Sequence, residues 1–569
     1  MSTTSIRILC LLFLSGVGLM TGLTPLYGQP VFSPSGYFDH IPFHRCDTLR
    51  GALNPERSCY DVTFYHLDLR IDPATRQVGG SVDIHFLAVA DFERIQVDLF
   101  RNLTIDSITS PDRGLLKWVR ECDAVLIEAG THAAGQEGII RVAYHGTPVT
   151  APMPPWDGGF VWATDKDGMP WVAVACEGEG ASLWWPNKDH LSDEPDSLSM
   201  RIEVPATLSC IANGNLRKVE PTEPGWHAFH WAVSYPINNY NVSVNIGRYA
   251  HFSDIWVASD GDSLQCDYYV MHHNLEKAME HFQQVHPMLD CFESIFGKYP
   301  FWNDGFALVE TPYLGMEHQS AIAYGNKYQR GYLGGMIPED MDWDYIIIHE
   351  TGHEYWGNSI GCNDLSEMWI HESFTTYMEA LYVECRYGYQ DAIRYLNSQR
   401  NYIRNLEPII GPNGVNWHNW KSSDHYYKGA WVLHTLRHAT GDEGLWYPLL
   451  RQLYERHAMQ QITTEEIVDF VNTATGKDWT AFFRQYLLHP AIPQLEYSVK
   501  ATARGTMLTC RWVADEPGFA MPVVVGSPKK KVQITPNTEI RSFELEGIAP
   551  EEFQVATDLF LVSTKEIKP

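Results

Sequence analysis

The chain has 569 residues, too many for one hydrophobic core, so roughly two to four domains are expected. Its hydrophobic fraction of 44% and aromatic fraction of 13% are typical of globular proteins. The formal net charge of -28 at pH 7 argues against nucleic acid and anionic lipid as partners, because both are negatively charged.

Residues 1–28 have the pattern of a secretory signal peptide. Arg7 precedes an apolar run from Ile8 to Met20, and a cleavage after Gly28 would leave Gln29 as the mature start. The apolar run is too short to cross a bilayer comfortably, and no other segment is long and apolar enough. The sequence therefore predicts an exported protein, periplasmic or extracellular, without a transmembrane segment and with a short N-terminal extension over residues 29–55.

The chain contains 11 cysteines, and none of them forms a C-x-x-C pair that would indicate a cysteine zinc site. In an exported protein, Cys46 and Cys59 are close enough in sequence to form a disulfide. Free buried cysteines are the alternative.

Residues 56–255 are predicted to form a β-rich N-terminal domain. Residues 61–72 alternate apolar and polar side chains, as a half-buried strand does. Gly79 and Gly80 are expected to end this unit before a second alternating run over residues 81–88. The pattern favours a large antiparallel β domain.

The pattern changes near Asn274, and residues 256–492 are predicted to form a mostly helical domain. Helical spacing is present at 275–296, 344–356, 367–387, 390–406, 428–438, 465–472 and 476–486. Alternation returns at 495–500 and 541–545, which predicts a small β-sandwich over residues 493–569. The fold class expected is a multidomain α+β protein.

A metal-binding pattern lies in the second of these helical stretches. His349 and His353 are four residues apart, so on a helix they share one face and can bind one ion. Glu350 between them is the general base that this H-E-x-x-H motif usually supplies. Gly352 is unfavourable inside a helix by about 1 kcal/mol relative to alanine, which indicates a neighbour that needs its small size.

Glu372, in the next helical stretch, is the candidate third ligand. Two histidines and one glutamate leave the fourth position of a tetrahedral zinc ion open for water, as catalysis requires. Glu379 is seven residues further on and faces the same way, so it can hydrogen-bond a ligand histidine. His371 points about 100° away from Glu372 and is expected to have a structural or supporting role. One zinc ion per chain is predicted.

Three further segments add to this pattern. The tripeptide Gly-Met-Glu occupies residues 315–317, Tyr426 precedes a Tyr-Lys-Gly segment, and Glu177 lies upstream of a Trp-Trp-Pro segment at 184–186. In order and spacing, residues 60–490 resemble the gluzincin aminopeptidases, the family of aminopeptidase N and leukotriene A hydrolase, and especially its short bacterial members. The resemblance implies a thermolysin-like catalytic domain.

The resemblance also implies roles for these residues. Glu317 and Glu177 would bind the free α-amine of a peptide, while Gly315 and Met316 would hold the peptide in an extended pose. Glu179 is the competing candidate for the role of Glu177, because it would share its strand face. His318 stands where the family's motif has asparagine.

Glu350 would activate a zinc-bound water, and Tyr426 would stabilise the oxyanion, with Tyr427 as the competing tyrosine. The function that follows is a zinc aminopeptidase hydrolysing the N-terminal bond of peptides with a free α-amine. The alternatives are a thermolysin-type zinc endopeptidase and a catalytically silent peptide-binding module. The sequence does not specify an oligomeric state.

Overall fold

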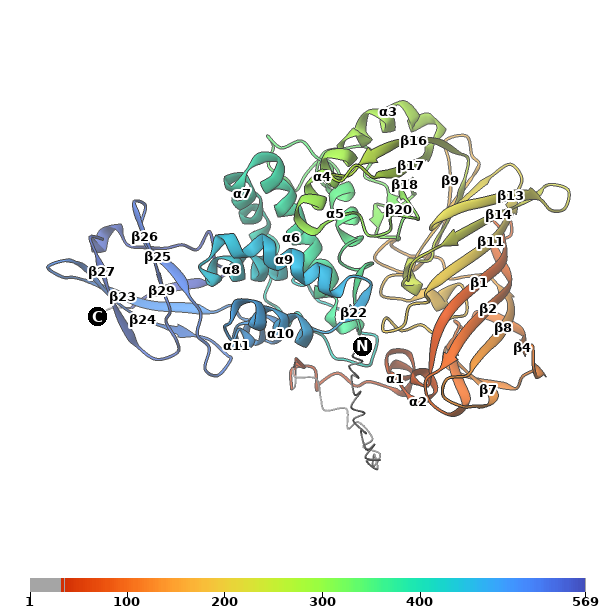
Figure 1. The fold of residues 1–569 in the computed structure, drawn as a ribbon, viewed down its shortest axis with the longest axis horizontal. Coiled ribbons are helices and arrows are strands. Elements are labelled where there is room, and N and C mark those ends of the chain that lie inside the picture. Colours follow the sequence, from red (N-terminus) through yellow and green to blue (C-terminus); the bar gives the residue numbers. More distant parts are fainter. Residues whose placement is uncertain (1–31, 35, 568–569) are drawn as a thin grey trace, which may run out of the picture. The chain divides into compact units, whose positions relative to one another are not determined.

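The computed structural model describes residues 32–34 and 36–567, so the predicted signal peptide at 1–28 lies outside the described residues. The described chain is a multidomain α+β protein with a large β-sheet region at its N-terminal side and a helical central region (Figure 1). The fold class expected from the sequence is confirmed. Within the described ranges, no helix combines the length and apolarity needed to cross a membrane.

The β-rich region is built around one eight-stranded sheet in residues 60–233, with the order β13-β14-β11-β1-β2-β8-β4-β5. Its pairs are antiparallel apart from β1 with β11, which is parallel. The strands are β1 (Tyr60–Asp72), β2 (Gln77–Ala88), β4 (Leu103–Ser110), β5 (Gly114–Leu115), β8 (Glu137–Gly146), β11 (Ser197–Pro205), β13 (Asn215–Pro221) and β14 (Trp226–Val233).

Gly79 and Gly80 do not end a strand, contrary to the sequence-based expectation, because both lie inside β2. A Cβ at Gly80 would lie 2.1 Å from the Asp68 carbonyl oxygen of β1, and its φ of 147° is one that other residues rarely adopt. The glycine therefore allows close strand approach. The turn itself precedes β2, and Asp72 accepts the Ala74 backbone N–H there.

Two smaller sheets complete this region. They comprise β9 (Gly159–Thr164), β10 (Pro170–Ala175), β12 (Ser209–Ala212) and β15 (Val244–Gly247) in one, and β3 (Phe92–Asp98), β6 (Trp118–Glu121) and β7 (Ala124–His132) in the other. The sheets bury one apolar cluster, which includes the tryptophans Trp184 and Trp185.

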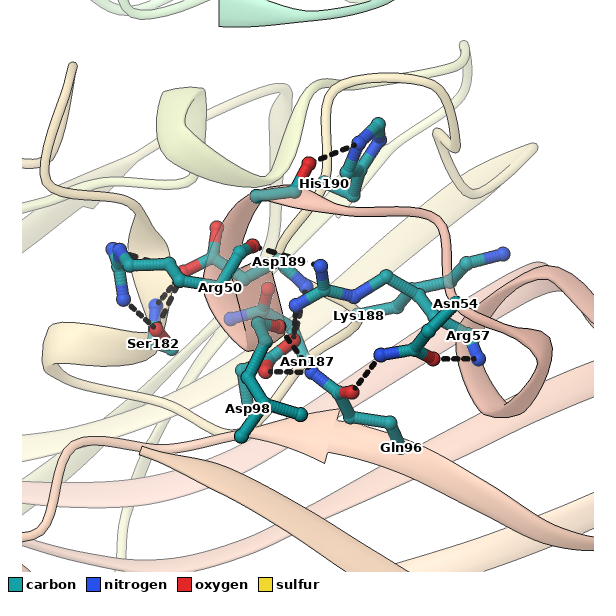
Figure 2. Close-up of polar contacts among 12 residues, drawn as sticks. Arg50, Asn54, Arg57, Gln96, Asp98, Ser182, Asn187, Lys188, Asp189 and His190 are labelled. Carbon is teal, nitrogen blue, oxygen red and sulfur yellow. Dashed lines mark hydrogen bonds and ion pairs between the residues drawn. The ribbon is translucent and has the colours of Figure 1, made fainter. Parts of the chain in front are cut away.

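A buried polar network joins the start of the described chain to these sheets (Figure 2). Short helices α1 (Arg45–Gly51) and α2 (Pro55–Ser58) precede β1. The guanidinium of Arg57 is fully buried and lies 2.7 Å from the Asp98 carboxylate at the end of β3. Asp98 also accepts the Asp189 backbone N–H and the Gln96 side-chain amide, so each of these buried charges has several partners.

The central region contains a five-stranded sheet in residues 249–324 that the sequence pattern did not reveal, with the order β16-β17-β18-β20-β19. Its strands are β16 (Tyr249–Val257), β17 (Ser263–Met271), β18 (Phe306–Glu310), β19 (Gly315–Met316) and β20 (Ile322–Tyr324). β18 and β20 are buried at every position, so they show no alternation by which a strand could be recognised.

Helices form around this sheet close to the expected segments, with three differences. The expected helix at 275–296 is divided by a 3-10 turn at Phe282–Gln284, the helix expected at 390–406 ends at Gln399, and a helix at Glu443–His457 was not expected. That helix contains Pro448, which is unusual inside a helix. The helices are α3 (Leu275–His281), α4 (Val285–Phe296), α5 (Tyr345–His353), α6 (Trp369–Tyr387), α7 (Tyr389–Gln399), α8 (Tyr427–Thr440), α9 (Glu443–His457), α10 (Thr464–Thr475) and α11 (Thr480–Leu488).

Short strands β21 (Ile360–Cys362) and β22 (Gln460–Ile462) pair between the helices. After α11, two small sheets share the apolar core of the helical region. They comprise β23 (Gln494–Ala501), β24 (Gly505–Val513), β27 (Arg541–Glu546) and β29 (Ser563–Glu566) in one, and β25 (Val523–Ser527), β26 (Lys530–Ile534) and β28 (Gln554–Val555) in the other.

Two disulfides link distant parts of the described chain. Cys46 is bonded to Cys122, and Cys291 in α4 is bonded to Cys385 in α6. The expected pairing of Cys46 with Cys59 is wrong, because Cys59 is a free, buried thiol. The sequence separation of 76 residues between the bonded partners shows why proximity along the chain did not identify the pair.

Candidate active site

Helix α5 presents the H-E-x-x-H motif. Its N-terminus is capped by Asp344, whose carboxylate accepts the backbone N–H groups of Ile346 and Ile347. His349 and His353 lie one turn apart, with their Nε2 atoms separated by 3.2 Å. The helix is buried along its whole length, so its imidazoles face other protein elements rather than bulk water.

Helix α6 brings Glu372 to the same point. Its Oε2 atom lies 3.5 Å from His349 Nε2 and 3.4 Å from His353 Nε2. Tetrahedral zinc, with bonds of about 2.0–2.1 Å to nitrogen and oxygen, separates neighbouring ligand atoms by about 3.3 Å. The three donor atoms are therefore spaced as one zinc ion requires, and Glu372 Oε2 is buried without a hydrogen-bond partner.

Supporting contacts hold both imidazoles in orientation. His349 Nδ1 lies 2.7 Å from Glu379 Oε1, as the seven-residue spacing from Glu372 allowed. Glu379 Oε2 in turn accepts hydrogen bonds from the Tyr395 hydroxyl and the Gln399 amide of α7. His353 Nδ1 lies 2.9 Å from the Trp356 carbonyl oxygen. Contacts of this kind leave Nε2 of each ring free to bind a metal.

Two glycines allow the helices to approach. A Cβ at Gly352 of α5 would lie 3.0 Å from Thr375 of α6, which is the small-residue requirement that the sequence indicated. A Cβ at Gly429 of α8 would lie 1.7 Å from the Ser373 hydroxyl of α6. A larger residue at either position would push α5 or α8 away from α6. The side chains that the displaced helix carries would move with it.

Gly315 and Met316 of the Gly-Met-Glu segment form strand β19, which contacts α5. A Cβ at Gly315 would lie 2.5 Å from Glu350 Oε1, so only glycine leaves room for that carboxylate. Glu317 follows the strand and accepts a hydrogen bond of 2.9 Å from the Tyr240 hydroxyl. Tyr240 comes from the β-rich region, and no local pattern in the sequence indicated that it would reach this site.

Glu177 enters the same cavity from the end of β10. It lies in a turn after the strand, so the argument that Glu179 would share its strand face is wrong. Glu179 instead lies 3.8 Å from His418 in an ion pair in which both side chains are partly exposed. Of these two glutamates, Glu177 is the one that lines the cavity.

Tyr426 is the residue before the first turn of α8, and its ring stacks on His349 with 6.0 Å between the ring centroids. Burial first, and then the negative charge of Glu372, raise the pKa of Tyr426 well above its usual value. Tyr427 turns toward Tyr402 and Glu379 instead. The hydroxyl of Tyr426 is therefore the closer of the two to the Glu372 carboxylate.

The nine residues predicted to bind metal, bind substrate or act in catalysis all line one cavity of about 640 Å³, and the competing Tyr427 lines it too. Its wall also includes aromatic and imidazole side chains that the sequence reading did not identify. The nine residues are Glu177, Gly315, Met316, Glu317, His349, Glu350, His353, Glu372 and Tyr426, and the additional wall residues include Trp156, Tyr332, Tyr345, His418, Trp420 and His425.

The electrostatics of the cavity are dominated by buried carboxylates. Burial and the proximity of Glu317 raise the pKa of Glu177 well above its usual value. Burial likewise raises the pKa of Glu317, and it raises that of Glu350 to about 8 although the two histidines act in the opposite direction. At Glu372 burial is outweighed by His353 and His349, which hold the pKa well below its usual value. The site therefore favours cations.

Two other histidines do not reach the cavity lining. His371 accepts the Cys362 backbone N–H through Nε2, in agreement with the structural role expected of it. His318 is fully buried, and neither ring nitrogen has a hydrogen-bond partner. Burial lowers the pKa of His318 to about 3, so its ring is neutral at ordinary pH.

Comparison with known proteins agrees with this geometry. Residues 280–486 match the Peptidase family M1 domain. Aminopeptidase N of Escherichia coli is 24% identical over 55% of this chain and 37% of its own length, and leukotriene A-4 hydrolase of Xenopus laevis is 20% identical over 81% of this chain and 76% of its own. This chain thus spans less than two thirds of the length of aminopeptidase N.

The fold is shared with an M1 zinc metallopeptidase of Deinococcus radiodurans, crystallised as a mutant bound to a Tyr-Ser-Ala substrate. The TM-score is 0.64 at 18% identity, over 78% of this chain and 98% of that one. The matched domain is that of the M1 zinc metallopeptidases. The match to the Peptidase family M1 domain and the similarity to aminopeptidase N confirm the resemblance to the gluzincin aminopeptidases seen in the sequence, and this family implies zinc as the metal.

Proposed function

We propose that this protein is a zinc aminopeptidase, which removes the N-terminal residue of peptides with a free α-amine. The observation that carries the proposal is the arrangement of one cavity. Its wall contains both a triad of metal donors and the buried carboxylates of Glu177 and Glu317. A buried carboxylate pair is costly unless a cation neutralises it, and a peptide's α-ammonium is such a cation.

His349, His353 and Glu372 would hold one zinc ion per chain. When bound, zinc supplies Lewis-acid chemistry, which polarises the scissile carbonyl and lowers the pKa of a coordinated water to about 7. Its positive charge would also lower the pKa of Glu350, so that the carboxylate is ionised and able to accept a proton at neutral pH.

The protein's own groups then perform the proton transfers. Glu350 accepts a proton from the attacking water as the oxygen bonds to the carbonyl carbon, and it returns the proton to the amine as the C–N bond breaks. The Tyr426 hydroxyl donates a hydrogen bond to the carbonyl oxygen as negative charge develops there. Its raised pKa keeps the hydroxyl protonated for this purpose.

Glu177 and Glu317 fix the distance between the α-ammonium and the bond that is cut. Tyr240 orients Glu317, and Glu317 has no lysine or arginine partner among the described ion pairs. Because the ammonium must reach these carboxylates, the cavity admits one residue before the scissile bond. This measuring role separates an aminopeptidase from a thermolysin-type endopeptidase.

The test compares an aminoacyl fluorogenic amide with its N-acetylated form. The wild type should hydrolyse only the free-amine substrate, and Glu317→Gln should lose roughly 2–5 kcal/mol in kcat/KM on it, as removal of one member of a buried charge pair does. Glu179→Gln is the matched control, because Glu179 lies nearby but outside the cavity lining, and its kcat/KM should stay near the wild-type value.

Equal cleavage of the acetylated substrate would instead support the endopeptidase. Absence of hydrolysis of any peptide by the zinc-loaded protein would support the silent peptide-binding module. Unchanged kinetics of Glu317→Gln would remove the argument for amine recognition.

We propose further that the protein is exported to the periplasm or the extracellular space. The signal-peptide pattern in residues 1–28 supports this, and so do the two disulfides, which persist in oxidising compartments. N-terminal sequencing of the protein from an expressing host is the test. Gln29 at the N-terminus of material outside the cytoplasm is the expected result, and an uncleaved N-terminus on cytoplasmic protein would contradict it.

A further inference from the structure

A second group of metal-binding side chains lies on the central sheet, away from the cavity. Asp254 of β16 and Cys266 of β17 are directly paired across the antiparallel strands, so their side chains leave the sheet on the same face. Cys266 is fully buried and free, while the Asp254 side chain is about half exposed. A buried thiol therefore lies next to a partly exposed carboxylate on one face of the sheet.

Helix α4 supplies a third side chain to this point. His286, in its first turn, places Nε2 3.1 Å from Asp254 Oδ1. Nε2 is buried and has no hydrogen-bond partner, so the two atoms are in contact without the geometry of an N–H···O bond. One donor atom from each of Asp254, Cys266 and His286 lies within 4.8 Å of the others.

We propose that Asp254, Cys266 and His286 form a second divalent-metal site of the zinc type. Thiolate, imidazole and carboxylate together are ligands that zinc accepts in tetrahedral sites, and three of them leave one position for water from the exposed side of Asp254. None of the three lines the catalytic cavity, so the site is separate from the one proposed for peptide hydrolysis.

Ordinary packing explains only part of this cluster. Asp254 Oδ1 also accepts a hydrogen bond of 3.2 Å from the Tyr268 hydroxyl of β17. Two further regular hydrogen bonds to α4 come from Trp256 of β16, which donates to Asp290, and from Ser259 after β16, which donates to Glu293. The contact of His286 with Asp254 also joins α4 to β16, but it lacks the geometry of a hydrogen bond. A series of helix-to-strand hydrogen bonds gives no reason for a thiol at the base of this pair.

A metal ion here would add a further link between three elements that strand pairing, hydrogen bonds and packing already hold together. It would join β16 and β17 to the first turn of α4, and α4 is already linked to α6 by the Cys291–Cys385 disulfide. Burial raises the pKa of Cys266 to about 12, so without metal the thiol keeps its proton. Binding converts it to the thiolate, and the proton is released to solvent.

Cobalt substitution separates this site from the catalytic one. Co²⁺ bound to a thiolate has an intense charge-transfer absorption in the near ultraviolet, and His349, His353 and Glu372 contain no sulfur. The full-length protein, stripped of metal and loaded with Co²⁺, should show this band and bind about two metal ions per chain. Zn²⁺ added to the loaded protein should remove the band.

Cys266→Ser should abolish the band and lower the metal content to about one ion per chain. Cys510→Ser is the matched control, because Cys510 is also a buried free thiol but has no histidine or carboxylate partner in the described metal groups. That variant should keep both the band and the second ion. Peptidase activity should be retained in both variants.

His286→Gln and Asp254→Asn guard against misfolding of the cysteine variant, since both side chains are partly exposed. Each should weaken the cobalt–thiolate band at limiting metal. Absence of the band in the folded wild type would overturn the proposal, and so would a band that persists in Cys266→Ser. A wild type that binds only one ion per chain and keeps full hydrolysis would also overturn it. Because the readout does not depend on turnover, a failure of the aminopeptidase proposal would leave this result interpretable.

Discussion

Two regions of the molecule bury charged side chains, but only one of them pairs these charges within the protein. Around α2 and β3, the Arg57 guanidinium faces the Asp98 carboxylate, and its Nη1 donates to the backbone carbonyls of Arg50 and Ala52. In the cavity, burial and the negative charge of Glu317 raise the pKa of Glu177, and no cation is paired with either carboxylate among the described ion pairs. The first region satisfies its charges internally, whereas the second leaves negative charge for a ligand.

The difference indicates which buried charges serve the fold and which serve binding. A buried ion pair costs free energy to desolvate, and it is tolerated when every member is hydrogen-bonded. Buried carboxylates without a cation are tolerated only where something else compensates them in the working protein. The following predictions can sharpen or break this distinction, from the largest expected effect to the smallest.

The largest effect is expected at Glu350. Glu350→Gln removes the group that accepts the proton of water while preserving the size of the side chain, so kcat should fall by roughly 10²–10⁴-fold. Zinc content, measured by atomic emission, should remain that of the wild type because Glu350 is not one of the proposed ligands. A variant with a near-normal rate would contradict the role of general base.

Around α2 and β3, where Arg57 is paired with Asp98, a substitution should change the stability of the protein rather than its turnover. Arg57→Ala leaves the Asp98 carboxylate buried without its cation, and the free energy of unfolding should fall by roughly 3–5 kcal/mol. Denaturant titration measures this loss. The double variant Arg57→Met/Asp98→Leu should recover part of it, and a single variant as stable as the wild type would break the distinction.

Glu194 tests burial of a carboxylate outside both regions. Burial raises its pKa from 4.5 to about 8, and the amides of Gln461 and Asn238 offset this only in part. Since the folded state keeps a proton that the unfolded state releases, the contribution of Glu194 to the free energy of unfolding is most favourable below pH 4.5 and declines as the pH rises to about 8. Glu194→Gln should remove up to about 4 kcal/mol of this decline.

Unfolding at a series of pH values measures the Glu194 effect. The wild type and Glu194→Gln should be close in stability at the acid end and should diverge toward pH 8. Parallel curves would show that this carboxylate is not held neutral by its surroundings.

A smaller effect, on zinc affinity, is expected at Glu379, which contacts His349. Glu379→Gln weakens the contact that orients His349, and zinc affinity should fall by roughly 10–100-fold. Competition with a chromophoric chelator measures the dissociation constant. Affinity equal to that of the wild type would show that packing of α5 against α6 orients the imidazole without help from Glu379.

The sequence predicted the helices that carry the metal site, because their chemistry is local. His349 and His353 share a helical face through spacing alone, and Asp344 provides an N-cap that fixes where α5 begins. The choice of Glu372 rested on its place in a second helical pattern and on the ligands that catalytic zinc takes. Its distance to the histidines came only with the packing of α5 on α6. Gly352 was noticed in the sequence, but its neighbour Thr375 was not identifiable there.

Other features depend on contacts between residues far apart in the chain. The strands β18 and β20 lack alternation because they are buried on both faces, and a short apolar run does not distinguish strand from helix. The pairing of Cys46 with Cys122 depends on how α1 lies against the hairpin of β6 and β7. Neither could be inferred from neighbouring residues.

The sequence by itself determined the chemistry that the protein carries: which side chains can bind a metal, accept a proton or attract an amine. Only the tertiary structure placed Glu177 rather than Glu179 in the cavity wall, brought Tyr240 to Glu317, and placed Cys266 next to Asp254 and His286. The physical reason is the distance along the chain over which each effect acts. Helical periodicity acts over a few residues, whereas burial and charge proximity depend on every element that packs around a side chain.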